Sequence, residues 1–134
     1  MKIYLIDDDP NILNILKIII QTRNLGEICG LCGSPVDAME DLKYCKPDIV
    51  IIDLLMPGMD GIQVLEEMQR RELLDDIPVI MITADTSADS MSHAYELGVA
   101  DYIERPFDVQ VVRRRVMNTV KLYARQRRLR GFTG

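Results

Sequence analysis

The sequence predicts an α/β fold in which a doubly wound, five-stranded parallel sheet carries helices on both faces. Two observations lead to this prediction. Apolar runs of strand length alternate with helical patterns along the chain, which implies right-handed crossovers between parallel strands. Two of the runs, "DIVIID" (48–53) and "PVIMIT" (78–83), are apolar on both faces, as central parallel strands are. The length of 134 residues predicts a single domain.

Five short apolar runs are predicted to form the strands. They lie at 2–6, 27–32, 48–53, 78–83 and 100–104. The second run contains Cys29 and Cys32 in a CxxC spacing, which can indicate a metal or redox pair. Because residues three apart in a strand point to opposite faces, we expect these two cysteines to be structural.

Each run is followed by a segment with helical periodicity and a residue suited to begin a helix. The predicted helix starts are Asp9 with Pro10, Ser34 with Pro35, Gly61, Ser87 and Asp108. Apolar residues then recur at steps of three and four, as Ile12, Leu16 and Ile19 do in the first helix. Gly26 and Gly98 are predicted to end the first and fourth helices.

The net charge of −5 is unevenly distributed. Residues 1–108 contain 21 acids and 8 bases, a balance of −13, whereas residues 109–134 contain 8 bases and no acid, a balance of +8. No apolar run reaches the 18 residues of a membrane span, and the N-terminal stretch ends in acids rather than in a cleavage site. We therefore expect a soluble, cytoplasmic protein without a membrane contact.

The notable polar residues all follow predicted strands. Asp7 and Asp8 come after the first strand, Asp53 ends the third, Thr83 ends the fourth and Arg105 follows the fifth. Ligands of open parallel sheets bind beyond the carboxyl ends of the strands, so we expect these side chains to meet there. Three carboxylates can hold Mg²⁺, and a hydroxyl with a cation can accommodate a phosphoryl group. The central Asp53 is the best candidate nucleophile for forming an acyl phosphate.

Four segments carry a resemblance to a known family: "IDDD" (6–9), "DLLMPGMDG" (53–61), "MITAD" (81–85) and "DYIERPF" (101–107). With these segments, the chain resembles the receiver (CheY-like) domain of two-component response regulators over roughly residues 1–123. The resemblance implies a flavodoxin-like (βα)5 fold with strand order 2-1-3-4-5. It also implies a signalling domain rather than an enzyme, whose own chemistry is limited to its phosphorylation and dephosphorylation.

The resemblance further implies roles for single residues. Asp53 looks like the phosphoacceptor, which takes a phosphoryl group from a phosphohistidine of a sensor histidine kinase or phosphotransfer protein. Asp7 and Asp8 look like the Mg²⁺-binding acids of a phosphorelay receiver, together with Asp53 and the main-chain carbonyl of Leu55. Thr83 would donate its hydroxyl to a phosphoryl oxygen.

Tyr102 matches the aromatic residue of the family that turns inward when the domain switches. The fourth helix, the fifth strand and the fifth helix would then form the signalling face, which is also a possible dimer interface. One position departs from the family: Arg105 stands where receivers have a lysine. Arginine keeps the charge and can make a bidentate contact with phosphate, so we expect phosphorylation to survive. Two alternatives remain open for the switch: Arg105 substitutes for the lysine, or it alters the coupling of phosphorylation to the switch.

The basic C-terminal segment, residues 124–134, lies beyond the domain. A helix over 109–130 would be roughly 33 Å long, more than is needed to cover the sheet, so we expect its end to project. Two interpretations remain open: a linker to an output domain, or a basic face that binds an acidic partner or polyanion. The linker is favoured, and binding of nucleic acid by this domain alone is not expected, since no nucleic-acid motif accompanies the charges.

Two rival functions remain. A scaffold that binds partners without phosphorylation is suggested by Arg105, although it would not need the three carboxylates. A haloacid-dehalogenase-like phosphohydrolase would use Asp7 and Asp9 as nucleophile and acid. That class leaves the block around Asp53 unexplained, and the chain is short for it.

Overall fold

A computed structural model describes residues 1–7, 9–32, 35–53, 61–74, 76–84 and 87–133. Strands and helices alternate strictly within these residues. In chain order they are β1 (Lys2–Ile6), α1 (Pro10–Thr22), β2 (Glu27–Cys32), α2 (Pro35–Cys45), β3 (Ile49–Asp53), α3 (Gly61–Arg70), β4 (Val79–Thr83), α4 (Ala88–Leu97), β5 (Asp101–Glu104) and α5 (Val109–Thr133). The five predicted strands agree with this assignment to within one residue at each end.

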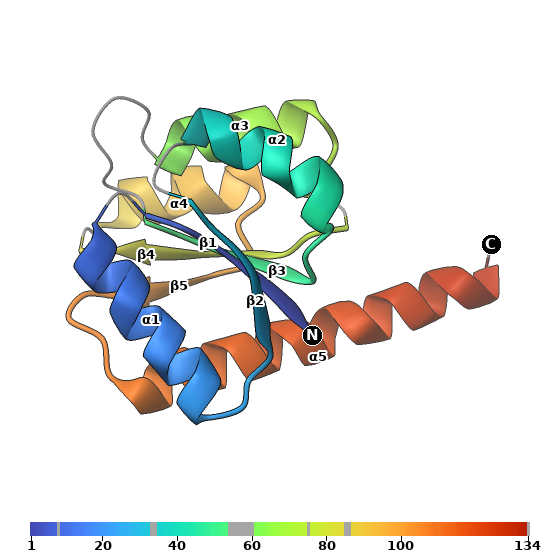
Figure 1. Cartoon of the computed structure of the whole chain (residues 1–134). Coiled ribbons are helices and arrows are strands. Elements are labelled where there is room, and N and C mark those ends of the chain that lie inside the picture. Colours follow the sequence, from blue (N-terminus) through green and yellow to red (C-terminus); the bar gives the residue numbers. More distant parts are fainter. Residues whose placement is uncertain (8, 33–34, 54–60, 75, 85–86, 134) are drawn as a thin grey trace.

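The strands form one parallel sheet in the order β2-β1-β3-β4-β5, which confirms the predicted fold class and strand order. Helices α2, α3 and α4 cover one face of the sheet, and α1 and α5 cover the other (Figure 1). The chain leaves β1 toward β2 and returns to β3 on the other side. The switch point of the sheet therefore lies between the carboxyl ends of β1 and β3.

The two faces of the sheet each bury an apolar core. Every residue of β3 and β4 is buried, as expected for strands with helices on both sides. On one face, Tyr4, Val50 and Met81 pack with residues of α2, α3 and α4. On the other, Ile51 and Ile80 pack with residues of α1 and α5. This packing fixes the strand ends, and with them the side chains that follow.

A register shift in the β1–β2 pair overturns the expectation that Cys29 and Cys32 point to opposite faces of the strand, although both still pack against the core. Ile3 pairs with Ile28, but Tyr4 pairs with Gly30, so Cys29 is an extra residue in β2. The extra residue changes the parity of the strand, and Cys29 and Cys32 consequently pack against the same core cluster. A Cβ atom on Gly30 would lie 2.4 Å from the ring of Tyr4, so glycine is required there.

The helix caps predicted at Asp9, Ser87 and Asp108 are confirmed. Their side chains accept hydrogen bonds from main-chain N–H groups in the first turns of α1, α4 and α5. Gly98 ends α4 in the left-handed conformation, with φ of 107°.

The predicted end of the first helix at Gly26 is wrong, because α1 ends at Thr22. Asn24 adopts the left-handed conformation, with φ of 52°, and the N–H of Leu25 donates to the carbonyl of Ile20. This Schellman closure ends the helix before the glycine is reached. Gly26 instead allows close approach of the chain to the Met1 carbonyl, which would lie 2.7 Å from an added Cβ.

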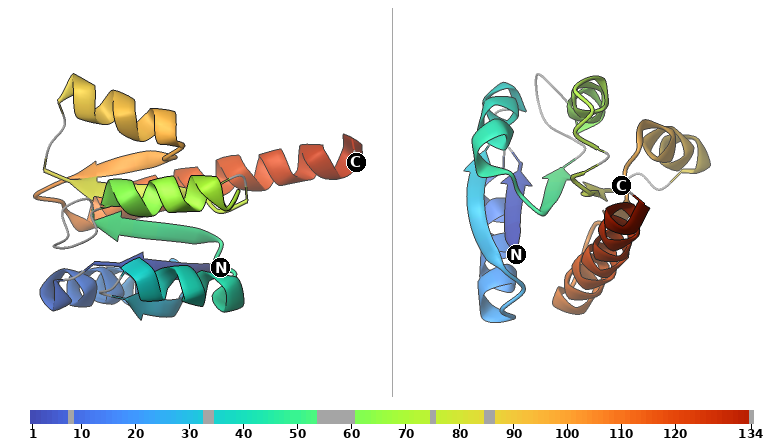
Figure 2. Two further views of the ribbon diagram at one scale, coloured as in Figure 1. Left: turned by 90° about the horizontal axis from the view of Figure 1, so that it is seen from above. Right: turned by 90° about the vertical axis from the view of Figure 1, so that its right-hand side faces the viewer.

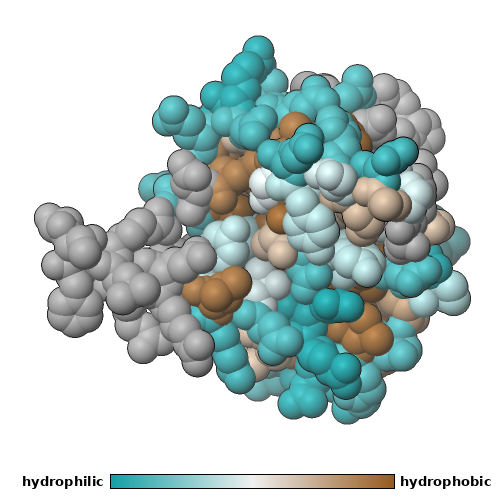
Figure 3. Space-filling view, turned by 180° about the vertical axis from the view of Figure 1, so that it is seen from behind, coloured by the Kyte–Doolittle hydropathy of each residue, from teal (hydrophilic) through white to brown (hydrophobic). Residues whose placement is uncertain are grey.

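Helix α5 is longer than the sheet that it covers. Its 25 residues span about 37 Å at 1.5 Å per residue, and the C-terminal turns extend past the rest of the fold (Figures 1 and 2). On the face of the molecule shown in Figure 3, hydrophobic side chains form small separate patches among hydrophilic ones. In the part of the chain that the structure describes, no helix combines the length and the apolar character needed to cross a bilayer.

Candidate functional site

Three of the predicted site residues lie together at the carboxyl edge of the sheet. Asp7 directly follows β1 and Asp53 is the last residue of β3; the two strands pair up to Ile6 and Ile52, so the two carboxylates are neighbours. Thr83 is the last residue of β4, the next strand. Asp7, Asp53 and Thr83 are buried, with exposures of 1%, 3% and 1%. The edge therefore places two carboxylates and a hydroxyl out of bulk water.

Arg105 brings a cation to the same place. It follows β5, and its main-chain N–H donates to the carbonyl of Thr83 at 2.9 Å. Its Nη2 donates to Oδ2 of Asp53 at 2.7 Å and to Oδ2 of Asp7 at 3.4 Å. One guanidinium thus lies against two buried carboxylates. We call Asp7, Asp53 and Arg105 the acidic-edge cluster.

Burial dominates the electrostatics of Asp7. It raises the pKa of Asp7 from 3.8 to about 7. The main-chain N–H of Asp9, which donates to Oδ1 of Asp7 at 2.9 Å, and the Arg105 guanidinium oppose this rise, while the neighbouring Asp53 carboxyl adds to it. Two acids therefore share one cation. When both acids are ionised, a second cation would neutralise the remaining negative charge.

The donor chemistry fits Mg²⁺. Adjacent carboxylate oxygens are the ligands that this ion prefers, and Asp7 and Asp53 supply them at one edge. The other predicted ligands, Asp8 and the carbonyl of Leu55, lie outside the described residues. Among the described residues, no group of three or more His, Cys, Asp and Glu side chains is arranged to hold a metal ion. A complete ligand set would thus need groups beyond Asp7 and Asp53.

Tyr102, the predicted switch residue, lies on β5 and is half-buried. The guanidinium carbon of Arg115, on α5, lies 5.6 Å from the centroid of the Tyr102 ring, and Nη1 of Arg115 lies 3.4 Å from Oδ2 of Asp101. Burial, and next the Asp101 carboxylate, raise the pKa of Tyr95 on α4. The contacts of Arg115 with Asp101 and Tyr102 were not predicted from the sequence, because no periodicity links a residue on a strand with a residue on a helix.

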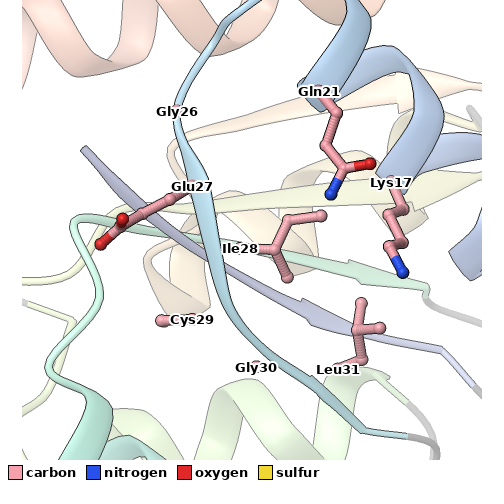
Figure 4. A pocket seen from close by; sticks show the side chains of 8 residues that line it. All are labelled: Lys17, Gln21, Gly26, Glu27, Ile28, Cys29, Gly30 and Leu31. Carbon is pink, nitrogen blue, oxygen red and sulfur yellow. The ribbon is translucent and has the colours of Figure 1, made fainter.

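A groove between α1 and the edge strand β2 was also not predicted. Figure 4 shows Lys17 and Gln21 on α1 beside Ile28 and Leu31 on β2. The remaining lining residues are Gly26, Glu27, Cys29 and Gly30. None of the predicted site residues lines this groove, so the acidic edge remains the candidate functional site.

Comparisons with known proteins agree with this site and fold. A family model described as the response regulator receiver domain matches residues 3–117. The chain is 33% identical over 112 residues to the "Probable C4-dicarboxylate response regulator DctR" of Bacillus subtilis (strain 168), which covers 84% of this chain and 49% of that protein. It is 30% identical over 128 residues to the "DNA-binding transcriptional regulator NtrC" of Escherichia coli (strain K12), covering 96% and 26%. The chain thus spans about half or less of these relatives.

Solved structures show the same fold. The signal receiver domain of a putative Luxo repressor protein from Vibrio parahaemolyticus superposes with a TM-score of 0.85 at 22% identity, covering 96% of this chain and 95% of that one. A CheY-like receiver domain protein from Methanospirillum hungatei JF-1 gives 0.83 at 18% identity, covering 93% and 97%. With the family match over most of its length, this chain belongs to the response regulator receiver domain family of two-component signalling.

Proposed function

We propose that this receiver domain is a phosphorylation switch in which Asp53 accepts a phosphoryl group from a phosphohistidine of a sensor histidine kinase or a phosphotransfer protein. The grouping of two buried carboxylates, Asp7 and Asp53, with Arg105 at one edge of the sheet carries the proposal. Asp53 lies on the central strand of the sheet, where an incoming group can approach it from beyond the strand ends.

In the proposed reaction, a carboxylate oxygen of Asp53 attacks phosphorus and the P–N bond to the histidine breaks. The imidazole leaves with the bonding electron pair and takes up a proton, and an acyl phosphate remains on Asp53. Thr83 would donate its hydroxyl to a phosphoryl oxygen. Arg105, which donates to Asp53, would supply positive charge beside the oxygens that carry the developing negative charge.

Mg²⁺ is the proposed cofactor, held by the carboxylates of Asp7, Asp8 and Asp53 and by the main-chain carbonyl of Leu55. When bound, it would neutralise charge on the phosphoryl oxygens. Burial of Asp7 and Asp53 supports this assignment, because buried carboxylates of like charge are stabilised by a cation.

The proposed output is a change of the face formed by α4, β5 and α5, through Thr83 and Tyr102. Two contacts support this output: the main-chain N–H of Arg105 donates to the carbonyl of Thr83, and Arg115 on α5 lies over the ring of Tyr102 on β5. This face could also form a dimer. We assign residues 1–123 to the receiver domain and residues 124–134 to a basic extension that leads toward an output domain.

The test is the intact mass of the protein after incubation with acetyl phosphate, with and without Mg²⁺. We expect the wild type to gain about 80 Da, one phosphoryl group, only when Mg²⁺ is present. Asp53→Ala should gain nothing, and Asp9→Ala, a matched change at a helix cap, should gain the same mass as the wild type.

Two results would contradict the proposal. A gain that persists in Asp53→Ala would identify another nucleophile, as the phosphohydrolase alternative predicts for Asp7. No gain in the wild type would favour a scaffold that works without phosphorylation, with Arg105 as the permanent counter-charge of the two acids.

A further inference from the structure

The sequence contains one CxxC pair, Cys29 and Cys32, but the structure gives its two thiols different neighbours. Both side chains turn to the core cluster on the α2 side of the sheet, because Cys29 is an extra residue in β2. The Cys32 thiol lies beside the hydroxyl of Tyr4, whose pKa is raised by burial, by a hydrogen bond to Asp41 and, to a smaller degree, by Cys32. Cys29 has a different neighbour, the third cysteine of the chain, Cys45.

Cys29 and Cys45 are in contact although 16 positions separate them. Cys45 is the last residue of α2, and its Sγ donates to the carbonyl oxygen of Cys29 at 3.3 Å. Burial raises the pKa of the Cys29 thiol to about 11, and the charge and hydrogen bonding of the Cys45 side chain add to the rise. The two thiols are therefore neighbours, which is the first requirement for a disulfide.

Both thiols are also open to a small reagent. Cys29 and Cys45 are free and only partly buried, whereas Met39 and Leu42, which pack in the same cluster from α2, are 4% and 2% exposed. A small molecule can therefore reach the pair without unfolding of the helix. Thiol–disulfide exchange depends on such access as well as on the thiolate content.

We propose that Cys29 and Cys45 are a redox modification site, at which a small-molecule disulfide oxidises the pair to a reversible disulfide between β2 and the end of α2. None of the residues of the acidic-edge cluster takes part in it. The inference therefore does not depend on the phosphorylation of Asp53.

In the proposed reaction, the Cys45 thiolate attacks one sulfur of the small disulfide, and the first small thiolate leaves and takes up a proton. Cys29, once deprotonated, attacks the Cys45 sulfur of this mixed disulfide and displaces the second small thiolate, which is protonated in turn. The two protein thiols lose two electrons and two protons, and the reagent gains them as two thiols. Cys45 is assigned the first attack because the raised pKa of Cys29 keeps that thiol protonated at neutral pH.

The cross-link would add a covalent attachment to the edge of the sheet. β2 is the edge strand of the described sheet, with β1 as its neighbour. A bond from Cys29 to Cys45 closes residues 29–45 into a loop, which limits the conformations of the unfolded chain more than those of the folded one. We therefore expect the oxidised protein to unfold at a higher urea concentration than the reduced one.

The first experiment incubates the folded Cys32→Ser variant, whose two remaining thiols are the proposed pair, with excess oxidised glutathione. Its intact mass should fall by about 2 Da, the two hydrogens that a disulfide loses, without an attached glutathione. Dithiothreitol should reverse the loss. The wild type, treated in the same way, should form the same bond.

A tryptic digest locates the bond. Free thiols are first blocked with N-ethylmaleimide at acidic pH, so that no exchange follows. Trypsin cuts after Arg23, Lys43 and Arg70, and Lys46 is protected by the proline that follows it. Residues 24–43 should therefore be joined to residues 44–70, and in Cys32→Ser this product can contain only the proposed bond.

Two variants that break the pair serve as controls. In Cys29→Ser the reaction should stop at the mixed disulfide of Cys45 with glutathione, and Cys45→Ser should not give the joined product. The urea midpoint of the wild type should rise on oxidation and return with dithiothreitol, whereas that of Cys45→Ser should not rise.

Three results would overturn the inference. The first is a folded Cys32→Ser that keeps both thiols, or holds them only as mixed disulfides, in excess oxidised glutathione. The second is a joined product that forms in the wild type and is lost in Cys32→Ser, since it would place the bond at Cys32. The third is a bond that links two copies of the chain rather than two residues of one.

Discussion

Among the described residues, two clusters of three charged side chains can be compared, one buried at the carboxyl edge of the sheet and one at the surface end of α3. The acidic-edge cluster combines Asp7 and Asp53, both nearly inaccessible to solvent, with one cation, Arg105. Its charges do not balance, and burial raises the pKa of Asp7 to about 7. This cluster joins residues that are up to 98 positions apart in the sequence.

The α3 cluster has the opposite composition, with two cations and one acid. Glu67 accepts hydrogen bonds from Arg70 and, at 2.6 Å, from Nε of Arg71, and both partners lie within four residues of it. These bonds lower the pKa of Glu67, the bond from Arg70 contributing most. The Arg70 and Arg71 side chains are 75% and 35% exposed, so water competes with Glu67 for both guanidinium groups.

The difference shows that the environment, more than the geometry of the contacts, decides what an ion pair does. Water can replace a lost partner in the α3 cluster, so these contacts add little to folding. In the acidic-edge cluster, loss of a partner leaves a buried charge that water cannot solvate, so the free energy of unfolding should fall. Buried charged groups of this kind are typical of sites that bind a charged ligand.

The largest effect is expected for Arg105→Met. This change leaves Asp7 and Asp53 buried without their common cation, and the free energy of unfolding should fall by about 2–3 kcal/mol, part of the full penalty being relieved when one acid takes up a proton. Urea unfolding at pH 8 with EDTA measures it. Arg113→Met on the surface of α5 is the matched control.

A double variant sharpens this prediction. Asp7→Asn combined with Arg105→Met removes one of the two unpaired acids, so it should be more stable than Arg105→Met alone. Equal stability of the wild type and Arg105→Met would mean that the guanidinium does not support the buried acids, and the contrast between the clusters would be lost.

A second effect, on the order of a few kcal/mol, is expected in the pH dependence of stability. The pKa of Asp7 rises from 3.8 to about 7 on folding, so the folded state keeps a proton that the unfolded state releases in this window. The free energy of unfolding should therefore fall as the pH rises from about 4 to about 7. Asp7→Asn should remove this decline, matching the wild type at the acidic end and exceeding it above pH 7.

The measurement is a series of urea unfolding curves across this pH range in EDTA, with Glu66→Gln on the exposed side of α3 as control. The control should keep the decline. A decline of equal size in Asp7→Asn would show that Asp7 is not the group responsible.

The topology explains why the sequence was sufficient to predict which residues form the acidic edge. Parallel strands end at one edge, so Asp7, Asp53, Thr83 and Arg105 could be placed together from the strand runs alone. The contacts of Arg105 could not be predicted, because a long side chain after β5 can reach several places, and its choice depends on packing and charge in three dimensions.

The two errors in the fold have different origins, one in competing local signals and one in a contact between strands. Asn24 and Gly26 can both adopt the left-handed conformation that ends a helix, and the sequence does not say which does so. The extra residue at Cys29 follows from the fit of the Tyr4 ring over Gly30, a contact between two strands that alternation within one strand cannot reveal.

The smallest effect is expected for Glu67→Gln, which breaks both ion pairs of the α3 cluster at once. The urea midpoint should not change measurably, because Arg70 and Arg71 regain water, and added salt should leave the difference from the wild type near zero. Unfolding in low and high salt, beside Arg105→Met under the same conditions, provides the comparison. If Glu67→Gln lowered the free energy of unfolding as much as Arg105→Met does, burial would not be the property that separates the two clusters. The energetic argument that the acidic edge is a binding site for a charged ligand would then fail.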